Sequence, residues 1–432
     1  MNLSRTGIKK SLGPGILLAG ACIGGSHLVS STTAGAKFGF ALVGLILITN
    51  LFKYPFLLVG TRFTAATGLS LLEGFKSRNS LYLPIYLIVS LITGTFTIAA
   101  VSFVTGLLLR NIPLFSTFPQ YNLSIAILII SGFILLIGQY RALDRISKVL
   151  VTLLTIFTLF AVISLINKGY LIDFDFNFIN PEPSPWRLSN LSFLIPLMGW
   201  MPGPVELCVW PSLWMFSREK DSNHKANMKE AEFDFNLGYL ITVITAIFFL
   251  SLGALTMFKS GDIMLSDKGF DFARNLIRIY QEAIGSWAKW IIVPASFAAM
   301  FSTTLTCLDA YPRSISAIQG ILQGTDQGHI RSKREQKRLE LWIVIHVLAA
   351  VLALLIAKSG GITIPQFVFG AMTGSFLTAP IFAWMAMDTI NSSLVPKEFR
   401  YGKFMKYLSW IGLIFLSGFS LLFISNAFFG IG

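Results

Sequence analysis

The sequence GGSH at residues 24–27 and the sequence MPGP at residues 201–204 decide the fold, because each interrupts a long apolar run. Glycine gives up more conformational freedom in a helix than any other residue, and proline removes a backbone donor and clashes with the preceding turn. Both runs are therefore expected to be helices that break near their middle.

The interrupted runs belong to a chain with the composition of a membrane protein. Of its 432 residues 54% are hydrophobic and 13% are charged, which is about half the charged share of an average soluble domain. The apolar residues form runs of about 20 residues, the length that crosses a hydrocarbon core of about 30 Å as a helix. This pattern predicts an all-α integral membrane protein with about eleven transmembrane helices and no soluble domain.

The predicted spans cover residues 14–31, 39–60, 82–109, 121–139, 146–166, 191–214, 233–257, 287–310, 340–357, 365–390 and 405–427. The two interruptions fall in the first and the sixth spans, at the first helix of two successive five-helix sets. This arrangement is typical of inverted-repeat transporters, in which two discontinuous helices meet at the midplane. We expect a single polytopic domain over 1–432, with repeats at about 12–167 and 190–391 and an extra helix at about 404–427.

The distribution of lysine and arginine predicts the orientation. The N-terminus and the even-numbered connections carry 23 of these residues, and the odd-numbered connections carry 10. Because basic residues accumulate on the cytoplasmic side, we expect the chain in the cytoplasmic (inner) membrane with its N-terminus inside and its C-terminus outside. The net charge of +13 is then explained by topology and lipid contact, without nucleic acid.

Each interruption has one ionisable side chain beside it, His27 in the first and Glu206 in the sixth span. A carboxylate at membrane depth costs several kcal/mol unless it faces a cavity or a partner. We expect the two side chains to form the polar centre of a site and to share one bound cation. The competing structural interpretation is that Glu206 ties two helices together and that His27 is a satisfied polar residue.

Lys53 is a third charge within a span. A structural ion pair with Glu206 or Asp309 is the favoured interpretation, and binding of a substrate anion is the alternative. A wider substrate path is expected to include Gly25, Ser26, Lys53, Gly203 and Thr378. The cysteines Cys22, Cys208 and Cys307 all fall within spans without a Cys-x-x-Cys pair, which predicts small buried hydrophobes.

Three further stretches carry a resemblance to a known family: LGPG at 12–15, AGAKFG at 34–39 and FSTTLT at 301–306. Together with the span count and the break positions, they resemble the Nramp family of divalent-metal transporters, a branch of the amino acid–polyamine–organocation superfamily. The resemblance implies a secondary transporter that works by alternating access, with the metal as substrate and no cofactor. It also implies that the chain is not an enzyme.

The metal-binding motifs depart from the family pattern. In the family the first break reads Asp-Pro-Gly-Asn, so Gly24 stands at the metal carboxylate and offers only its carbonyl, while His27 stands at the ligand asparagine. In the sixth span the literal match puts Met201 at the metal-binding methionine. A shift of two residues would put Gly203 there and Glu206 at the asparagine after the family's histidine. The expected metal site is therefore Gly24, His27, Met201 and Glu206.

The third span also departs from the family, because the acidic pair used for proton passage falls on Thr95 and Ile98. Neither side chain exchanges a proton near neutral pH, so we predict that transport does not need that proton route. An alternative function is an amino acid or organic cation transporter of the same superfamily, in which Glu206 would meet the substrate amine. The sequence leaves the ion, the coupling ion, the direction of transport and the oligomeric state open.

Overall fold

A computed structural model describes residues 5–171, 181–258, 269–324 and 333–429. Within these ranges the regular structure is entirely helical. The long helices are α4 (Val43–Thr67), α6 (Tyr82–Leu109), α7 (Gln120–Asn167), α10 (Met228–Met257), α12 (Lys289–Gln323), α13 (Lys333–Ser359), α14 (Ile364–Ile390) and α15 (Lys403–Phe429). Shorter helices are α1 (Arg5–Ser11), α5 (Leu71–Arg78) and α11 (Gly269–Ile284), with single turns at Pro113–Phe115, Leu188–Asn190, Ser286–Ala288 and Lys397–Phe399.

Both predicted interruptions are real breaks. The first span consists of α2 (Pro14–Cys22), a π-helical turn η1 (Ser26–Ser31) and α3 (Thr32–Phe38), and its two halves are bent by 46°. The sixth consists of α8 (Leu191–Gly199), a 3-10 turn η4 (Val205–Cys208) and α9 (Val209–Ser222). The prediction of discontinuous first and sixth helices is confirmed.

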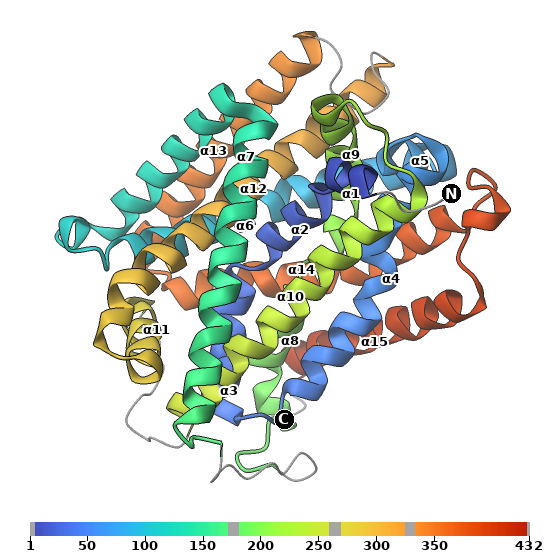
Figure 1. The fold of residues 1–432 in the computed structure, drawn as a ribbon. Helices are drawn as coiled ribbons and strands as arrows, with labels where there is room; N and C mark the ends of the chain where they lie inside the picture. The colour runs from blue at the N-terminus through green and yellow to red at the C-terminus, as the bar shows by residue number, and fades with distance from the viewer. Residues whose placement is uncertain (1–4, 172–180, 259–268, 325–332, 430–432) are drawn as a thin grey trace.

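Within the described ranges, the long apolar helices are somewhat fewer than the about eleven spans that the sequence predicts. In the described ranges eight helices are long and apolar enough to cross a membrane, and nine if the bent pair counts as one span. Two shorter apolar helices, Thr152–Asn167 and Leu188–Gly199, coincide with the fifth and sixth predicted spans. In Figure 1, α1 lies in the upper part of the view and α15 ends in the lower part.

One connection differs from the prediction. The fourth and fifth predicted spans lie in one assigned helix, α7, of 48 residues, which at 1.5 Å per residue would be about 72 Å long and too long for one crossing. Figure 1 shows α7 as two arms that meet at the top of the view. Residues 139–146 contain neither glycine nor proline, so nothing in the sequence ends the helical hydrogen bonding between the arms.

The broken first span packs closely on α10. A Cβ added to Gly35 would lie 2.0 Å from the Leu250 carbonyl oxygen, and one added to Gly253 would lie 2.1 Å from the Thr32 carbonyl oxygen. Such close backbone approach through small residues is typical of helix pairs in membranes. It fixes α3, and with it the lower half of the break, against α10.

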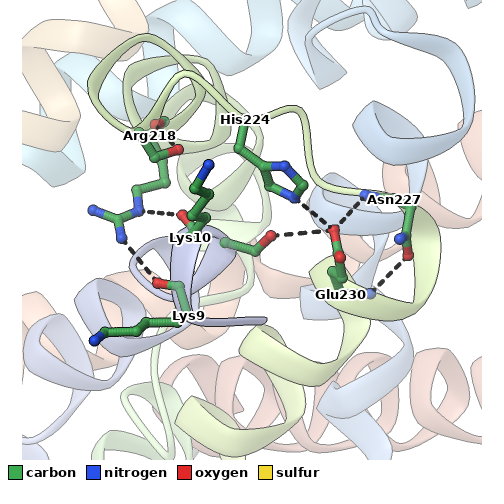
Figure 2. Close-up of polar contacts among 8 residues, drawn as sticks. Lys9, Lys10, Arg218, His224, Asn227 and Glu230 are labelled. Atoms are coloured by element: carbon green, nitrogen blue, oxygen red, sulfur yellow. Dashed lines mark hydrogen bonds and ion pairs between the residues drawn. The ribbon is translucent and has the colours of Figure 1, made fainter. Parts of the chain in front are cut away.

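A cluster of polar contacts holds α1, the short helix before the first span (Figure 2). Arg218 of α9 donates to the backbone carbonyls of Lys10 and Lys9, at 2.7 and 3.2 Å. Glu230 at the start of α10 accepts from the Ser11 hydroxyl, from the Asn227 backbone and from His224, at 3.3, 3.1 and 2.9 Å. Together these contacts join α1, α9 and α10.

Candidate functional site

The first break is a glycine turn closed by a threonine. The Gly24 amide donates to the Cys22 carbonyl at 2.9 Å, and the Leu28 amide donates to the Gly24 carbonyl at 2.9 Å. Thr303 of α12 donates its hydroxyl to the Gly20 carbonyl at 2.9 Å. Part of the backbone freed by the break is therefore satisfied by a neighbouring helix.

The same threonine fills the space beside Gly24. A Cβ added at Gly24 would lie 2.5 Å from the Thr303 Oγ1 atom and 2.8 Å from its Cγ2 atom. Real Cβ atoms do not approach heavy atoms so closely, so a side chain at this position requires Thr303 to move. Gly24 therefore contributes backbone only, and no carboxylate fits there without displacing Thr303.

His27 is fully buried and has both ring nitrogens engaged. Its Nε2 atom lies 2.9 Å from the Thr242 carbonyl oxygen of α10, which can only accept, so this nitrogen donates. Its Nδ1 atom lies 2.8 Å from the Ser26 hydroxyl and accepts from it in the neutral ring. A metal ligand needs a free nitrogen lone pair, so His27 would have to exchange a partner first. Its role as a ligand stays a prediction.

The second break exposes carbonyls at the end of α8. The Trp200 indole donates to the Ser375 hydroxyl of α14 at 3.0 Å, which anchors the break on one side. On the other side, the Lys53 ammonium donates to the carbonyls of Met198, Gly199 and Gly203 at 2.5, 2.8 and 3.1 Å. The predicted ion pair of Lys53 is therefore wrong, because its ammonium is saturated by three backbone oxygens.

Neither candidate partner of Lys53 is free to bind it. Asp309 instead makes a two-pronged ion pair with Arg313, at 2.5 and 2.8 Å, and accepts from the Trp214 indole at 3.0 Å. Glu206 has partners of its own. The sequence cannot show this arrangement, because backbone carbonyls are present at every residue.

Glu206 is a buried carboxylate whose partners, in the part of the chain that the structure describes, are hydroxyl groups. Its side chain accepts a short hydrogen bond from the Tyr311 hydroxyl, and the Thr93 hydroxyl lies 3.1 Å from both carboxylate oxygens. The residue is 1% exposed. Among the described residues no basic side chain lies within ion-pair distance of it. A charged Glu206 therefore has hydroxyl partners but no basic partner among the residues that the structure describes.

A small cavity lies between the two breaks. It has a volume of about 20 Å³, taken as the space open to the centre of a water molecule, which is room for about one water. Its lining comes from both breaks and from α6, α9 and α12: Ala21, Cys22, Gly25, Ser26, Thr97, Val101, Trp200, Pro202, Gly203, Pro204, Leu207, Trp210, Thr303, Cys307 and Tyr311. The expectation that the breaks face each other is confirmed, since residues of both line one space.

The predicted site residues divide into two groups. Gly25, Ser26 and Gly203 line the cavity. Met201 is fully buried, and Thr378 hydrogen-bonds within its own helix to the Gly374 carbonyl at 3.1 Å. Neither of these belongs to the lining.

His27 and Glu206 do not line the cavity, and they have different partners. The imidazole contacts Ser26 and Thr242, and the carboxylate contacts Thr93 and Tyr311. Within the described ranges, no three His, Cys, Asp or Glu side chains are grouped closely enough to hold a metal ion. Among the described residues, His27 and Glu206 therefore share no hydrogen-bond partner.

The third span contributes through residues that the sequence interpretation passed over. Thr95 and Ile98 were singled out, yet Thr95 bonds its own helix at the Leu91 carbonyl and Ile98 is buried. Thr93 and Thr97, one turn apart, instead contact Glu206 and line the cavity. Their i, i+4 spacing was visible in the sequence, but their direction depends on how α6 packs.

Two cysteines that were expected only to fill space in the core also line the cavity. All three cysteines are free and buried, as expected, but Cys22 and Cys307 line the cavity. Their positions gave a usable signal, because Cys22 directly precedes the first break and Cys307 follows the FSTTLT stretch. The cavity thus presents hydroxyl and thiol groups, with one carboxylate reached through Tyr311.

Comparisons with known proteins agree with this geometry. A family model described as natural resistance-associated macrophage protein-like (Nramp) matches residues 15–426. An uncharacterized protein of Pasteurella multocida is 36% identical over 419 residues, which is 96% of this chain and 92% of that protein.

Among solved structures, a manganese transporter of Eremococcus coleocola in complex with an aromatic bis-isothiourea compound is similar, with a TM-score of 0.68 and 18% identity. The match covers 100% of this chain and 90% of that one. MhsT in complex with L-phenylalanine has a TM-score of 0.61 and 16% identity, over 96% of this chain and 98% of that one. These likenesses support the predicted transporter fold with inverted repeats.

Proposed function

Because this chain belongs to the Nramp family, a family of metal-ion transporters, we propose that it carries a divalent metal cation through the cavity between its two broken helices. The family membership makes the chain a multi-pass membrane transporter, not an enzyme. A metal is then its substrate and not a resident cofactor.

The observation that carries the proposal is the state of Glu206. A buried carboxylate without a basic partner is expensive in a medium of low polarity. A cation beside it would offset that cost, and Tyr311, which touches both Glu206 and the cavity, links the carboxylate to the cavity.

The proposed site differs from the pattern of the wider family. Gly24 supplies no carboxylate, so Glu206 supplies the negative charge, with Met201 and His27 as candidate ligands after a change of partners. We further propose that transport proceeds by alternating access in the cytoplasmic membrane, with the N-terminus inside and the C-terminus outside. The two repeats, about 12–167 and 190–391, would be the moving parts.

The alternative of an amino acid or organic cation has less support. A cavity with room for about one water suits a single ion better than a molecule of many atoms. An amino-acid panel run beside the metals would detect the alternative by displacement or by its own binding signal.

The test is calorimetric titration of Mn²⁺, Fe²⁺, Mg²⁺ and Zn²⁺ into the purified protein in detergent. Glu206→Gln keeps the shape and deletes the charge, so it should abolish divalent binding. The matched control is Glu398→Gln, because Glu398 is an exposed carboxylate far along the chain. Unchanged affinity in Glu206→Gln would refute the metal site.

The pH dependence of divalent-metal binding gives a second measurement on the same protein. The ion competes with protons for the carboxylate, so its binding should weaken as the pH falls and should release protons on binding. Calorimetry in two buffers of different ionisation enthalpy measures the proton release. Divalent binding of equal strength at pH 5 and pH 8 would contradict a carboxylate ligand.

A further inference from the structure

Lys53 is a buried cation in a neutral cage. Its side chain is 0% exposed, and its three ammonium protons face three carbonyl oxygens, those of Met198, Gly199 and Gly203, at 2.5, 2.8 and 3.1 Å. An ammonium group has three donors and no acceptor capacity. Every donor of Lys53 is thus used by the backbone of a single helix break.

The sequence of the break explains why these carbonyls are available. In a continuous helix the Met198 carbonyl would accept from the amide four residues later, which is Pro202, and proline has no amide hydrogen. It keeps a long hydrogen bond from the Met201 amide, at 3.4 Å. The Gly199 carbonyl would accept from Gly203, but the chain leaves the helical path at Gly199. MPGP therefore removes donors from the end of α8, and Lys53 of α4 supplies replacements.

The electrostatics of this place favour a cation. The C-terminal end of a helix carries a partial negative charge of about half an elementary charge, and α8 ends at Gly199. Unwound carbonyls and half-helix C-terminal ends are the groups that hold monovalent cations in transporters with broken helices. No carboxylate lies within ion-pair distance of Lys53 in the described ranges, so the carbonyls are its counterpart.

We propose that the carbonyls of Met198, Gly199 and Gly203 form a monovalent-cation site whose resident occupant is the tethered ammonium of Lys53. A small soluble cation, such as ammonium, sodium or potassium, binds there once the side chain is shortened. The unmodified protein accordingly needs no such ion to hold its second break together. This inference is independent of the solute that the protein carries.

The test measures the thermal unfolding midpoint of the full chain in detergent, followed by tryptophan fluorescence. Each variant is titrated with ammonium, sodium or potassium chloride against choline chloride at constant ionic strength. Lys53→Ala removes the ammonium and leaves space, so its midpoint should fall by several degrees in choline chloride. It should rise again with the concentration of a small cation, since a ligand that binds only the folded state stabilises it.

Two variants serve as controls. Lys53→Met fills the same space without charge or donors, so its midpoint should fall and should not recover with any of the cations. Lys168→Ala removes an exposed lysine that donates to a single carbonyl, that of Glu282, at 2.8 Å. Neither its midpoint nor that of the unmodified protein should depend on which cation is present.

Three outcomes would overturn the proposal: a Lys53→Ala midpoint equal to that of the unmodified protein in choline chloride, a lowered midpoint that no small cation raises, or a sodium-specific rise in the unmodified protein. If Lys53→Ala is not recovered folded, Lys53→Ser replaces it, because its short side chain also leaves space for an ion. Its midpoint should likewise rise with a small cation, and a cation-independent midpoint there counts against the site.

Discussion

The two broken helices solve the same problem in opposite ways. The first break is made by glycines and is satisfied by neutral groups: Thr303 donates to its backbone and Ser26 and Thr242 hold His27. The second break is made by prolines and carries charge on both sides, with Lys53 on the carbonyls of α8 and Glu206 just beyond them. Both breaks nevertheless line one cavity.

The difference follows from what each residue type leaves unsatisfied. Glycine keeps its amide, so a glycine turn can close most of its own hydrogen bonds, as Gly24 and Leu28 do. Proline has no amide hydrogen, so the carbonyl four residues earlier loses its helical donor and needs one from elsewhere. We infer that the first break is shaped by packing and the second by electrostatics.

The largest expected effect comes from putting charge into the neutral break. Gly24→Asp places the carboxylate of the wider family where a Cβ already meets Thr303 at 2.5 Å. Overpacking costs about 1–3 kcal/mol and an unpaired buried charge costs about 3–5 kcal/mol, so the loss of unfolding free energy should exceed about 3 kcal/mol. Urea or thermal unfolding in detergent measures it.

The control for this change is the double variant Gly24→Asp with Thr303→Ala, which removes the clashing hydroxyl and methyl groups. It should recover part of the loss, because the two residues are in contact and their effects are not additive. Strictly additive losses would show that Thr303 does not occupy the space of the missing carboxylate.

The second prediction tests the charged break. Tyr311→Phe removes a donor from the Glu206 carboxylate and should cost about 1–3 kcal/mol, the usual effect of leaving a buried group unsatisfied. Tyr86→Phe is the matched control, because the Tyr86 hydroxyl donates to the backbone carbonyl of Glu206 at 3.2 Å. This substitution should cost only about 1 kcal/mol. In a Glu206→Gln background the cost of Tyr311→Phe should shrink. Equal costs in both backgrounds would contradict a charged carboxylate.

A smaller effect is expected at His27. His27→Ala leaves the Thr242 carbonyl without its donor and should cost about 1–2 kcal/mol. It should weaken divalent binding far less than Glu206→Gln, and His27→Asn should weaken it less than His27→Ala. Calorimetry on the three variants ranks them, and a loss of binding in His27→Ala as complete as in Glu206→Gln would place the imidazole on the ion.

The smallest effect is expected in the third span. Thr95→Val should change stability by no more than about 0.5 kcal/mol, because its hydroxyl bonds only its own helix. Thr93→Val, which removes a hydroxyl 3.1 Å from Glu206, should cost more and weaken metal binding. Uptake into proteoliposomes with and without a pH gradient tests the related prediction that the family's proton route is not used. Abolished proton influx in Thr95→Val would refute that prediction.

The breaks were predictable because glycine and proline act locally, on their own backbone and the turn before them. The two arms of α7 were predicted as separate spans, but the helical connection between them was not, because the sequence analysis placed the end of one span and the start of the next there. The partners of the site side chains were also beyond the sequence. His27 meets a carbonyl 215 residues away, and Glu206 meets a hydroxyl 105 residues away.

Lys53 illustrates the limit most clearly. A buried lysine suggests a carboxylate, and two were available in the sequence, yet the partners are carbonyls that no side-chain pattern encodes. The useful signal was the prolines of MPGP, because they predict carbonyls without donors. A buried lysine together with a double-proline break is therefore better interpreted as a cap than as half of an ion pair.

The size of the cavity sets a condition on any ion that enters it. A six-coordinate ion in solution holds six water molecules, whereas this cavity has room for about one. We expect an ion that occupies it in this conformation to arrive almost dehydrated, with Cys22, Ser26, Thr97 and Thr303 among the polar side chains that line the space. Because Mg²⁺ gives up its hydration shell reluctantly, we expect a cavity of this size to disfavour magnesium and to favour ions that exchange water easily.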